Sequence, residues 1–289
     1  MSHPTRRAAV LAACALALLL PSSASAAEQL YVSLGDSYAT GYQADVKKNT
    51  RNGFAYQVPG LAKKRGYDLE LVNFGCGGAT TVSLLERKGC PPRALGPGGE
   101  TYPSKTQMAA AETFIKKHRK RVGLITVSIS GNDVTKCAAA PDPIPCVAGA
   151  VEDIKKNVVT IAKRLRKAAG PKVKIVGTTY PDVILGGWVG EGANQNLASL
   201  SVIAFKSLIN PALKEAYGKA KGDFVDVTAA TGAYTPLEQT VADPTYGTIP
   251  VAVQKVCQLS FYCDMRDIHA RTEGYRIIAD LVAKRLPRR

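Results

Sequence analysis

A serine near the start of the chain stands where a nucleophile is often found. The stretch YVSLGDSYATG, residues 31–41, runs from an apolar segment directly into Gly35, Asp36 and Ser37. These residue types are common in turns, so the stretch also fits an ordinary turn. A serine at the carboxyl end of a buried strand, however, is where many open α/β enzymes place a nucleophile. The choice depends on whether the chain also supplies a base and an oxyanion site.

One histidine is well placed to act as that base. The chain has three histidines, of which His3 lies in a basic amino-terminal segment and His118 in a basic run typical of a solvated helix end. His269, in the stretch CDMRDIHARTEGY, precedes the last predicted helix. Because a serine nucleophile requires a base within hydrogen-bond distance, we predict that His269 takes the proton of Ser37.

Two further segments offer donors for a developing oxyanion. The glycine-rich stretch NFGCGGATT, residues 73–81, follows a predicted strand, and ISGNDV, residues 129–134, presents Asn132 after another. Each stretch alone also fits a simple turn. Acyl transfer requires donors aimed at the oxyanion, and the carboxyl ends of parallel strands converge on one edge of a sheet. Together with Ser37 and His269, these segments predict an acyl-transfer site at such an edge.

The alternation of apolar and amphipathic segments predicts an α/β fold. The predicted strands are Leu30–Leu34, Leu69–Asn73, Val122–Ile129, Val173–Thr178 and Phe224–Val227, and the predicted helices are Phe54–Arg65, Lys105–His118, Val147–Ala169, Asn194–Ala220 and Thr272–Leu286. Several strands are continuously apolar, as expected for a parallel sheet with helices on both faces. Pro211 is expected to split or kink its helix.

Two segments, Cys90–Ser104 and Thr228–Tyr262, are long and rich in turn-forming residues. Segments of this kind inside a compact domain are often functional loops. A surface excursion held by a disulfide is the alternative interpretation for both.

The first 26 residues have the features of a secretion signal. A positively charged start is followed by a 13-residue apolar run, Ala8–Leu20, and by an Ala-x-Ala sequence ending at Ala26. The run is shorter than the roughly 18 residues expected of a membrane span. Cys14 resembles a lipoprotein cleavage position, but the apolar run continues beyond it. We therefore expect cleavage after Ala26, secretion, and a single domain over residues 27–289.

Cysteine usage agrees with export. Six cysteines remain after the signal, and an even number in an exported chain favours disulfides. They fall into three couples that are local in sequence, so we predict the pairs Cys76–Cys90, Cys137–Cys146 and Cys257–Cys263. No couple has Cys-x-x-Cys spacing, so we expect no zinc site and no other metal.

The chain is strongly basic, with a formal net charge of +15. Its lysines and arginines are scattered and lack the interleaved aromatic residues that stack on bases, so we expect no nucleic-acid partner. In an exported protein, this charge favours peripheral attraction to an anionic envelope or lipid surface. We expect the protein to be a monomer.

The ordered motifs resemble those of the SGNH hydrolases, also called GDSL-type lipases and esterases. Ser37 lies in Gly-Asp-Ser, a glycine follows the second strand, Asn132 lies in Gly-Asn-Asp after the third, and His269 stands near the end. The resemblance covers nearly the whole mature chain, and the cysteine layout is similar to that of secreted actinobacterial lipases of this family. It implies a three-layer αβα fold, a five-stranded parallel sheet in flavodoxin-like order, and no cofactor.

The resemblance also implies a role for each motif residue. Ser37 would be the nucleophile and His269 the general base of ester hydrolysis through an acyl-enzyme. The oxyanion hole would combine the backbone N–H of Ser37, the backbone N–H of Gly78 and the side-chain amide of Asn132. Gly78 is selected because the family's Asn-x-x-x-x-Gly-x-Thr pattern places this glycine five residues after Asn73.

The sequence departs from the family pattern at two positions. Ser130 stands where the third motif usually begins with glycine, which a serine fits if its backbone keeps a negative φ. The family's acid lies three residues before the histidine, where this chain has Arg266. The partner of His269 is therefore Asp267, Asp264 or a main-chain carbonyl near Arg266. Asp267 is preferred, because side chains two residues apart in an extended segment point the same way.

These features predict a secreted carboxylic ester hydrolase that acts on acyl lipids or small acyl esters. Deacylation of an acylated cell-envelope or plant polysaccharide is the alternative, and a binding protein without turnover is disfavoured by the complete set of motif residues. The apolar stretch Tyr180–Gly190 follows the fourth strand and is expected either to line an acyl pocket or to belong to the core.

Overall fold

The computed structural model describes residues 28–190 and 192–289, so the predicted signal, residues 1–26, lies outside the described part. A five-stranded sheet has the order β4-β1-β5-β6-β7, and all its neighbouring strands are parallel. Its strands are β1 Gln29–Gly35, β4 Leu69–Asn73, β5 Val122–Ser128, β6 Lys174–Thr178 and β7 Asp223–Val225. This is the flavodoxin-like order, and it confirms the predicted α/β fold.

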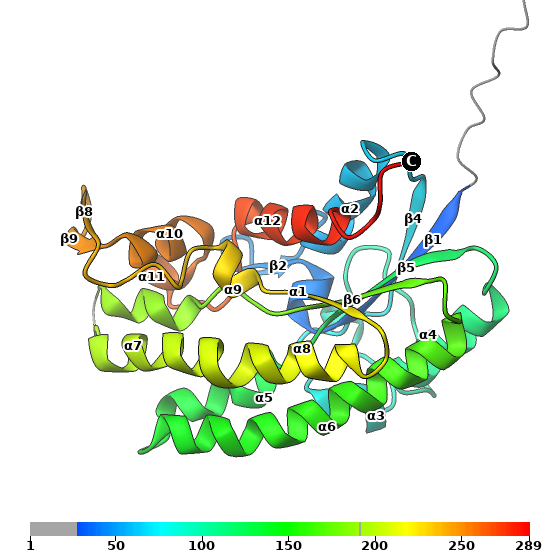
Figure 1. The fold of residues 1–289 in the computed structure, drawn as a ribbon, viewed down its shortest axis with the longest axis horizontal. Coiled ribbons are helices and arrows are strands. Elements are labelled where there is room, and N and C mark those ends of the chain that lie inside the picture. The colour runs from blue at the N-terminus through cyan, green and yellow to red at the C-terminus, as the bar shows by residue number, and fades with distance from the viewer. Residues whose placement is uncertain (1–27, 191) are drawn as a thin grey trace, which may run out of the picture.

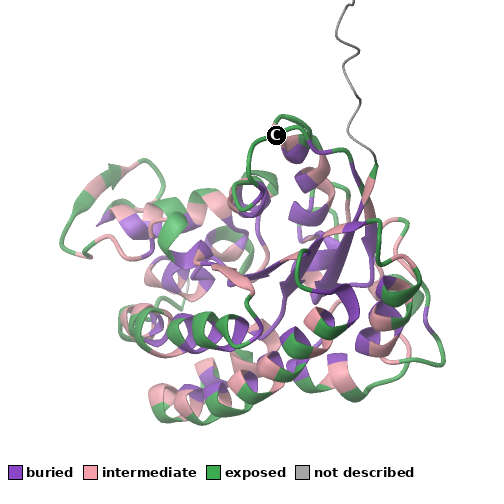
Figure 2. Cartoon of the chain, turned by 45° about the vertical axis from the view of Figure 1, so that its right-hand side comes forward, coloured by how far each residue is buried: buried purple, intermediate pink, exposed green. Residues whose placement is uncertain are grey.

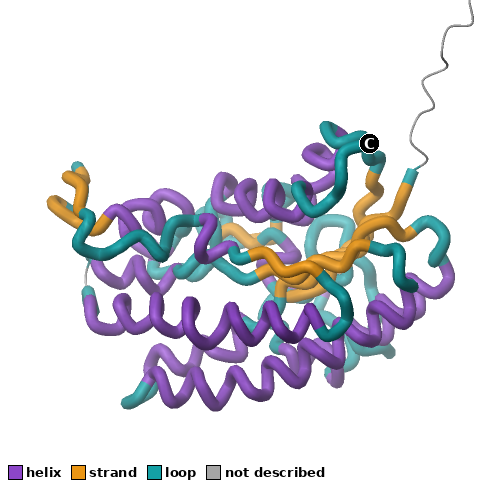
Figure 3. Tube along the Cα trace, in the orientation of Figure 1, coloured by secondary structure: helices purple, strands orange, loops and turns teal. Residues whose placement is uncertain are grey.

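Helices cover both faces of the sheet and make the second and third layers (Figures 1 and 3). One face packs against α2 (Phe54–Lys63) and α12 (Thr272–Ala283). The other packs against α4 (Gln107–Lys117), α6 (Pro143–Ala169) and α8 (Asn210–Gly218). Successive side chains of β1 alternate between the two cores: Tyr31 contributes to the first, and Val32 contributes to the second. Burial of both faces explains why the strands are continuously apolar (Figure 2).

Shorter elements follow the strand ends and complete the chain. They are α1 Ser37–Thr40, β2 Tyr42–Gln43, β3 Lys48–Asn49, α3 Thr81–Glu86, η1 Pro92–Ala94, α5 Gly131–Val134, η2 Thr135–Ala139, η3 Val183–Trp188, α7 Gln195–Ile203, η4 Ala204–Ile209, α9 Val227–Ala230, β8 Thr240–Asp243, β9 Gly247–Pro250, α10 Val251–Leu259 and α11 Tyr262–Met265.

The segment predicted to be irregular over Thr228–Tyr262 is more ordered than expected. It contains the hairpin β8–β9 and the helix α10. Ala252, Val253 and Val256 of α10 enter a third buried cluster, which also contains residues of η3. The helix depends on this packing, because its nine residues are too few to be stable alone. The predicted strand Phe224–Val227 ends early, at Val225, because the side chain of Asp226 caps α9.

Of the two effects expected at Pro211, a split or a kink, the split does not occur. Residues Gln195–Gly218 form one 24-residue helix, in which the π-helical η4 joins α7 to α8. Proline lacks an N–H and its ring collides with the carbonyl four residues earlier in a regular helix. The wider turn immediately before Pro211 accommodates both defects. The helix is apolar enough to cross a membrane by composition, but here it packs against α6 and η3.

A buried carboxyl group joins this helix to the end of the sheet. Asp182 is completely buried, where it accepts hydrogen bonds from the hydroxyl of Ser201 (2.9 Å) and from the backbone N–H of Leu185 (3.3 Å). Burial raises the pKa of Asp182 to about 7, against the smaller opposing effect of its hydrogen bonds. The folded protein therefore holds a proton on Asp182 in a pH range where the unfolded chain does not.

This difference predicts a specific pH dependence of stability. Because the folded pKa is raised, the contribution of protonated Asp182 is complete below about pH 4 and is lost as the pH rises to about 7. In Asp182→Asn, that loss should disappear. The difference in free energy of unfolding, wild type minus Asp182→Asn, should fall by on the order of a few kcal/mol between about pH 4 and pH 8. Urea denaturation across this range measures it.

The matched control is Asp153→Asn, which changes an exposed aspartate on α6. Its stability curve should run parallel to that of the wild type. Parallel curves for Asp182→Asn and the wild type would contradict the assignment of this proton to Asp182.

Candidate active site

A continuous chain of hydrogen bonds joins three of the predicted site residues. His269 Nε2 lies 2.7 Å from Ser37 Oγ, and His269 Nδ1 lies 2.7 Å from Asp267 Oδ1. The backbone N–H of His269 also donates to Asp267 Oδ1, at 2.9 Å. Asp264, the second candidate acid, instead pairs with Arg271 at 2.7 Å. Of the three partners considered for His269, the carboxylate of Asp267 is the one within hydrogen-bond distance of its ring.

The loop between α11 and α12 explains why the acid precedes the histidine by two residues. Arg266 ends α11 in the left-handed region, with φ of 52°, and its side chain donates to the carbonyl of Val189 at 2.9 Å. The chain then returns alongside Phe261, whose N–H donates to the carbonyl of His269. Asp267 and His269 flank one residue of this extended return, so both side chains face the same way.

The environment of Asp267 keeps it ionised. Partial burial raises its pKa, but hydrogen bonds from the ring and the backbone N–H of His269, together with the charge attraction to that ring, outweigh burial and leave the pKa below its usual value. An ionised carboxylate only accepts hydrogen bonds, so His269 Nδ1 must carry a proton. For His269 to act as a base, its Nε2 must accept the hydrogen of the Ser37 hydroxyl, and a proton on Nδ1 leaves Nε2 free to do so.

The turn that presents Ser37 is built from glycine and a buried acid. Gly35 has φ of 139°, and a Cβ there would overlap the carbonyl of Ser128 on the neighbouring strand, so only glycine fits. Asp36 is buried, and its carboxylate accepts the N–H of Tyr38 (2.9 Å) and the hydroxyl of Tyr180 (2.6 Å). Burial raises the pKa of Asp36 to about 6. Asp36 thus anchors the turn while Ser37 begins α1.

The candidate oxyanion donors flank Ser37 from both sides, because β4 and β5 are the two neighbours of β1. Gly78 follows β4 with φ of 77°, a left-handed conformation that favours glycine. Asn132 follows β5 and donates one amide hydrogen to the carbonyl of Ala79, at 2.9 Å. Within residues 28–190 and 192–289, no hydrogen bond occupies the backbone N–H of Ser37 or Gly78.

Asp133 clamps the two donor loops together, a contact that sequence analysis missed. Its carboxylate accepts the backbone N–H of Thr81 (3.0 Å) and the hydroxyl of Thr81 (2.6 Å). Asn157 of α6 donates to the same hydroxyl at 3.0 Å. The Gly-Asn-Asp stretch therefore supplies a donor through Asn132 and a brace through Asp133. The only signal in the sequence was the adjacency of these two residues.

The condition under which a serine would fit at Ser130 without strain, a negative φ, is not met. Ser130 has φ of 114° and ψ of −17°, and it is buried. This turn brings Gly131 against the ring of Tyr180, where a Cβ on Gly131 would lie 3.2 Å away. The Ser130 carbonyl accepts the N–H of Asp133 at 3.1 Å. A strained conformation of this kind costs about 1–3 kcal/mol and persists because its surroundings hold it.

Tyr38 links the serine turn to the histidine loop and was also missed. Its hydroxyl donates to the carbonyl of Ile268 at 2.7 Å, one residue before His269. Its ring centroid lies 5.9 Å from that of His269. A tyrosine one residue after the serine carries no distinctive sequence signal, since an apolar core role fits it equally well.

All three predicted disulfides are present, and each lies beside one part of the site. Cys76–Cys90 holds the loop that contains Gly78, Cys137–Cys146 ties η2 to α6, and Cys257–Cys263 ties α10 to α11.

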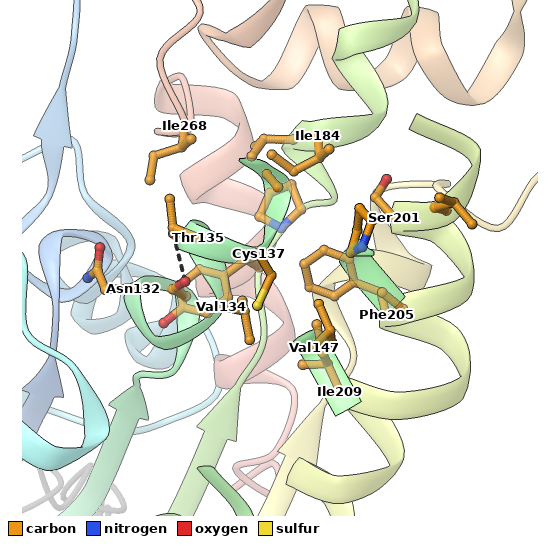
Figure 4. Close-up of a pocket in the computed structure, with 18 of the residues that line it drawn as sticks. Asn132, Val134, Thr135, Cys137, Val147, Ile184, Ser201, Phe205, Ile209 and Ile268 are labelled. Atoms are coloured by element: carbon orange, nitrogen blue, oxygen red, sulfur yellow. Dashed lines mark hydrogen bonds between the residues drawn. The ribbon is translucent and has the colours of Figure 1, made fainter. Parts of the chain in front are cut away.

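Ser37 lines an apolar cavity of about 120 Å³. Figure 4 shows other residues of its wall, among them Asn132 and Phe205. Its walls come from the α5–η2 segment, α6, η3 and the α7–η4 helix, and they include Val134, Val147, Ile184, Phe205 and Ile209. The stretch Tyr180–Gly190 is divided: Val183 and Ile184 line this cavity, whereas Leu185 and Val189 belong to the third buried cluster. Both expected roles of that stretch are therefore present.

Comparison with known proteins gives a family match. A model described as the GDSL-like Lipase/Acylhydrolase family matches residues 33–277. The extracellular lipase of Streptomyces rimosus is similar in structure, with 15% identity, 88% of this chain and 99% of that chain covered, and a TM-score of 0.51. Phospholipase A1 of Streptomyces albidoflavus NA297 has 16% identity, coverage of 80% and 98%, and a TM-score of 0.44. The aryl esterase of M. smegmatis has 14% identity, with 89% of this chain and 97% of that chain covered, and a TM-score of 0.42. No curated protein matches the sequence.

The contacts of His269 predict different effects for the two aspartates in its loop. Asp267→Asn should lower kcat for p-nitrophenyl butyrate on the order of a thousandfold or more, because the amide no longer selects the productive tautomer. Asp264→Asn, which removes only the exposed pair with Arg271, should change kcat by no more than a few-fold. Assays across pH measure both. The reverse pattern would reassign the acid, and two near-neutral variants would indicate a main-chain carbonyl.

Proposed function

The chain belongs to the GDSL-like lipase/acylhydrolase family and is a carboxylic ester hydrolase, and from this premise we propose that it is a secreted enzyme that cleaves acyl-lipid or small acyl esters through an acyl-enzyme on Ser37. The observation that carries the proposal is the hydrogen-bonded chain Asp267–His269–Ser37, in which Ser37 also lines an apolar cavity. The three disulfides support export, because such bonds persist in oxidising compartments.

Each step of the proposed reaction is assigned to a group of the candidate site. His269 Nε2 accepts the proton of Ser37 Oγ as that oxygen attacks the ester carbonyl. The N–H groups of Ser37 and Gly78 and the amide of Asn132 donate to the resulting oxyanion. His269 then gives the proton to the departing alcohol. Water attacks the acyl-enzyme with His269 again acting as base, which releases the acid and restores Ser37.

The apolar lining of the cavity supports the proposal that it binds the acyl group of the substrate. Its lining is mostly aliphatic beyond the site residues, and Val147, Phe205 and Ile209 lie across it from Asn132 (Figure 4). Deacetylation of a polysaccharide would leave most of this apolar surface without a contact. Trp188, the one tryptophan in the chain, packs against the third buried cluster instead of offering a platform for a sugar. We therefore favour acyl lipids and acyl esters over acetylated polysaccharide.

Ser37→Ala should abolish hydrolysis of p-nitrophenyl esters while the thermal transition and circular dichroism stay those of the wild type. Asn132→Ala should be milder, lowering kcat on the order of a hundredfold or more, as loss of one oxyanion donor does. Steady-state kinetics on both variants measure the difference. Near-wild-type turnover by a folded Ser37→Ala protein would show that Ser37 is not the nucleophile.

Phe205 should limit the length of the acyl chain. Phe205→Ala removes a ring from the cavity wall, so kcat/KM for long p-nitrophenyl esters should rise relative to short ones by roughly tenfold or more, the scale of a few methylene contacts. Ile203→Ala is the matched control, because Ile203 belongs to the same continuous helix but is 51% exposed and does not line the cavity. An unchanged chain-length profile in a folded Phe205→Ala protein would contradict the acyl role of the cavity.

A further inference from the structure

A second, strongly basic concavity lies at the opposite edge of the sheet from Ser37. This amino-edge groove, about 590 Å³ in volume, is formed by residues at the starts of β1, β5 and β6, by the segments before β4, β5 and β6, and by Leu286, Pro287 and Arg289. Five of its fifteen lining residues are Lys or Arg and none is Asp or Glu; the cations are Arg119, Lys120, Lys172, Lys174 and Arg289. The groove therefore concentrates positive charge in a hollow.

Local contacts fix part of this charge and leave the rest exposed. Arg119 Nε donates to the carbonyl of Ala169 at 3.3 Å. The Arg289 guanidinium lies 3.9 Å from the centre of the Tyr67 ring. Among the residues that the structure describes, Lys174 alone of the five lining cations pairs with a carboxylate, that of Asp223 at 3.2 Å. Lys120 and Lys172 are exposed. Most of the positive charge is consequently available to an external anion.

The flanking sequence adds to the positive potential. Beyond the lining residues, Lys116 and Lys117 precede β5, and Arg285 and Arg288 lie in the same segment as Arg289. The nearby carboxylates Glu28 and Glu70 both pair with Arg121, which does not line the groove. A concave site in which one sign of charge predominates focuses the electric field and attracts ions of the opposite sign. Because the cations are distributed over several loops, an anion with several charged groups would contact more of them than a single small ion.

We propose that the amino-edge groove binds a linear polymer that carries closely spaced phosphate groups, and that this contact tethers the enzyme while its active site stays open. The orientation of the sheet favours a flexible chain over a lipid surface. The seven residues of β1 separate the groove from Ser37 by roughly 20 Å. A flat membrane against the groove would therefore face away from the active site.

The lining also distinguishes this polymer from a nucleic acid. Single-stranded nucleic acids are bound by exposed aromatic side chains on which the bases stack. The one aromatic residue of the groove, Tyr67, is 6% exposed and lies beneath Arg289. The groove thus recognises charge along a backbone and offers no platform for a base.

The test measures binding of the full chain to linear polyphosphate at several salt concentrations. The groove variant is Lys120→Gln/Lys172→Gln/Lys174→Gln. The matched control is Lys156→Gln/Lys214→Gln/Lys255→Gln, which removes the same charge from exposed lysines on α6, α8 and α10. In the groove variant, Kd should rise about tenfold or more, and the slope of log Kd against log salt should fall by about two to three. The control should change much less.

Ester hydrolysis by both variants should equal that of the wild type, which shows that they are folded and keeps this test independent of the catalytic proposal. Phosphatidylglycerol vesicles and an oligothymidylate of matched charge are the competing probes. Equal weakening by the two triple variants would overturn the proposal, because net charge alone would then explain binding. Tighter binding of the vesicles or of the oligonucleotide than of polyphosphate would also overturn it.

Discussion

The close approach of β1 to β5 at their carboxyl ends is the constraint on which the site depends. Gly35 leaves no room for a side chain beside the Ser128 carbonyl, so the two strands end side by side in fixed register. The chain leaving β1 must then present Ser37, and the chain leaving β5 must present Asn132. Because β4 lies on the other side of β1, the loop with Gly78 approaches the same point. The sheet order thus gathers residues that are far apart in sequence.

The strand ends alone do not place the histidine, which arrives on a loop from the end of the chain. A polar contact supplies that link, because the hydroxyl of Tyr38 donates to the carbonyl of Ile268, next to His269. Asp36 in turn accepts the hydroxyl of Tyr180, whose ring packs edge-on against that of Tyr38. These bonds form in a region of low dielectric, where each is electrostatically stronger and each unmade bond is costly. Short disulfides hold the loops that carry Gly78 and the cavity wall. Hydrogen bonds and disulfides therefore fix the loops that carry the site residues.

The features that follow from local chemistry and strand order are predictable from the sequence. Apolar runs identified all five strands, and two-residue spacing favoured Asp267 as the partner that the structure places on His269. The errors arise where tertiary contacts override local preference. Helix α10 forms because a third cluster buries it, the turn before Pro211 widens within a continuous helix, and Ser130 takes a positive φ under neighbouring contacts. The cavity walls come from separate segments whose apolar residues could equally have filled a core.

Two carboxyl groups near Ser37 show how the environment divides their roles. Asp267 is only partly buried and accepts two hydrogen bonds from His269, so its pKa falls below the usual value. Asp36 is fully buried, and desolvation raises its pKa to about 6 despite donors from Tyr38 and Tyr180. Environments that push two pKa values apart assign different tasks to the same chemical group. Asp267 remains the ionised acceptor that orients the imidazole. Burial of the Asp36 carboxyl group is costly, but its hydrogen bonds hold the turn that presents Ser37.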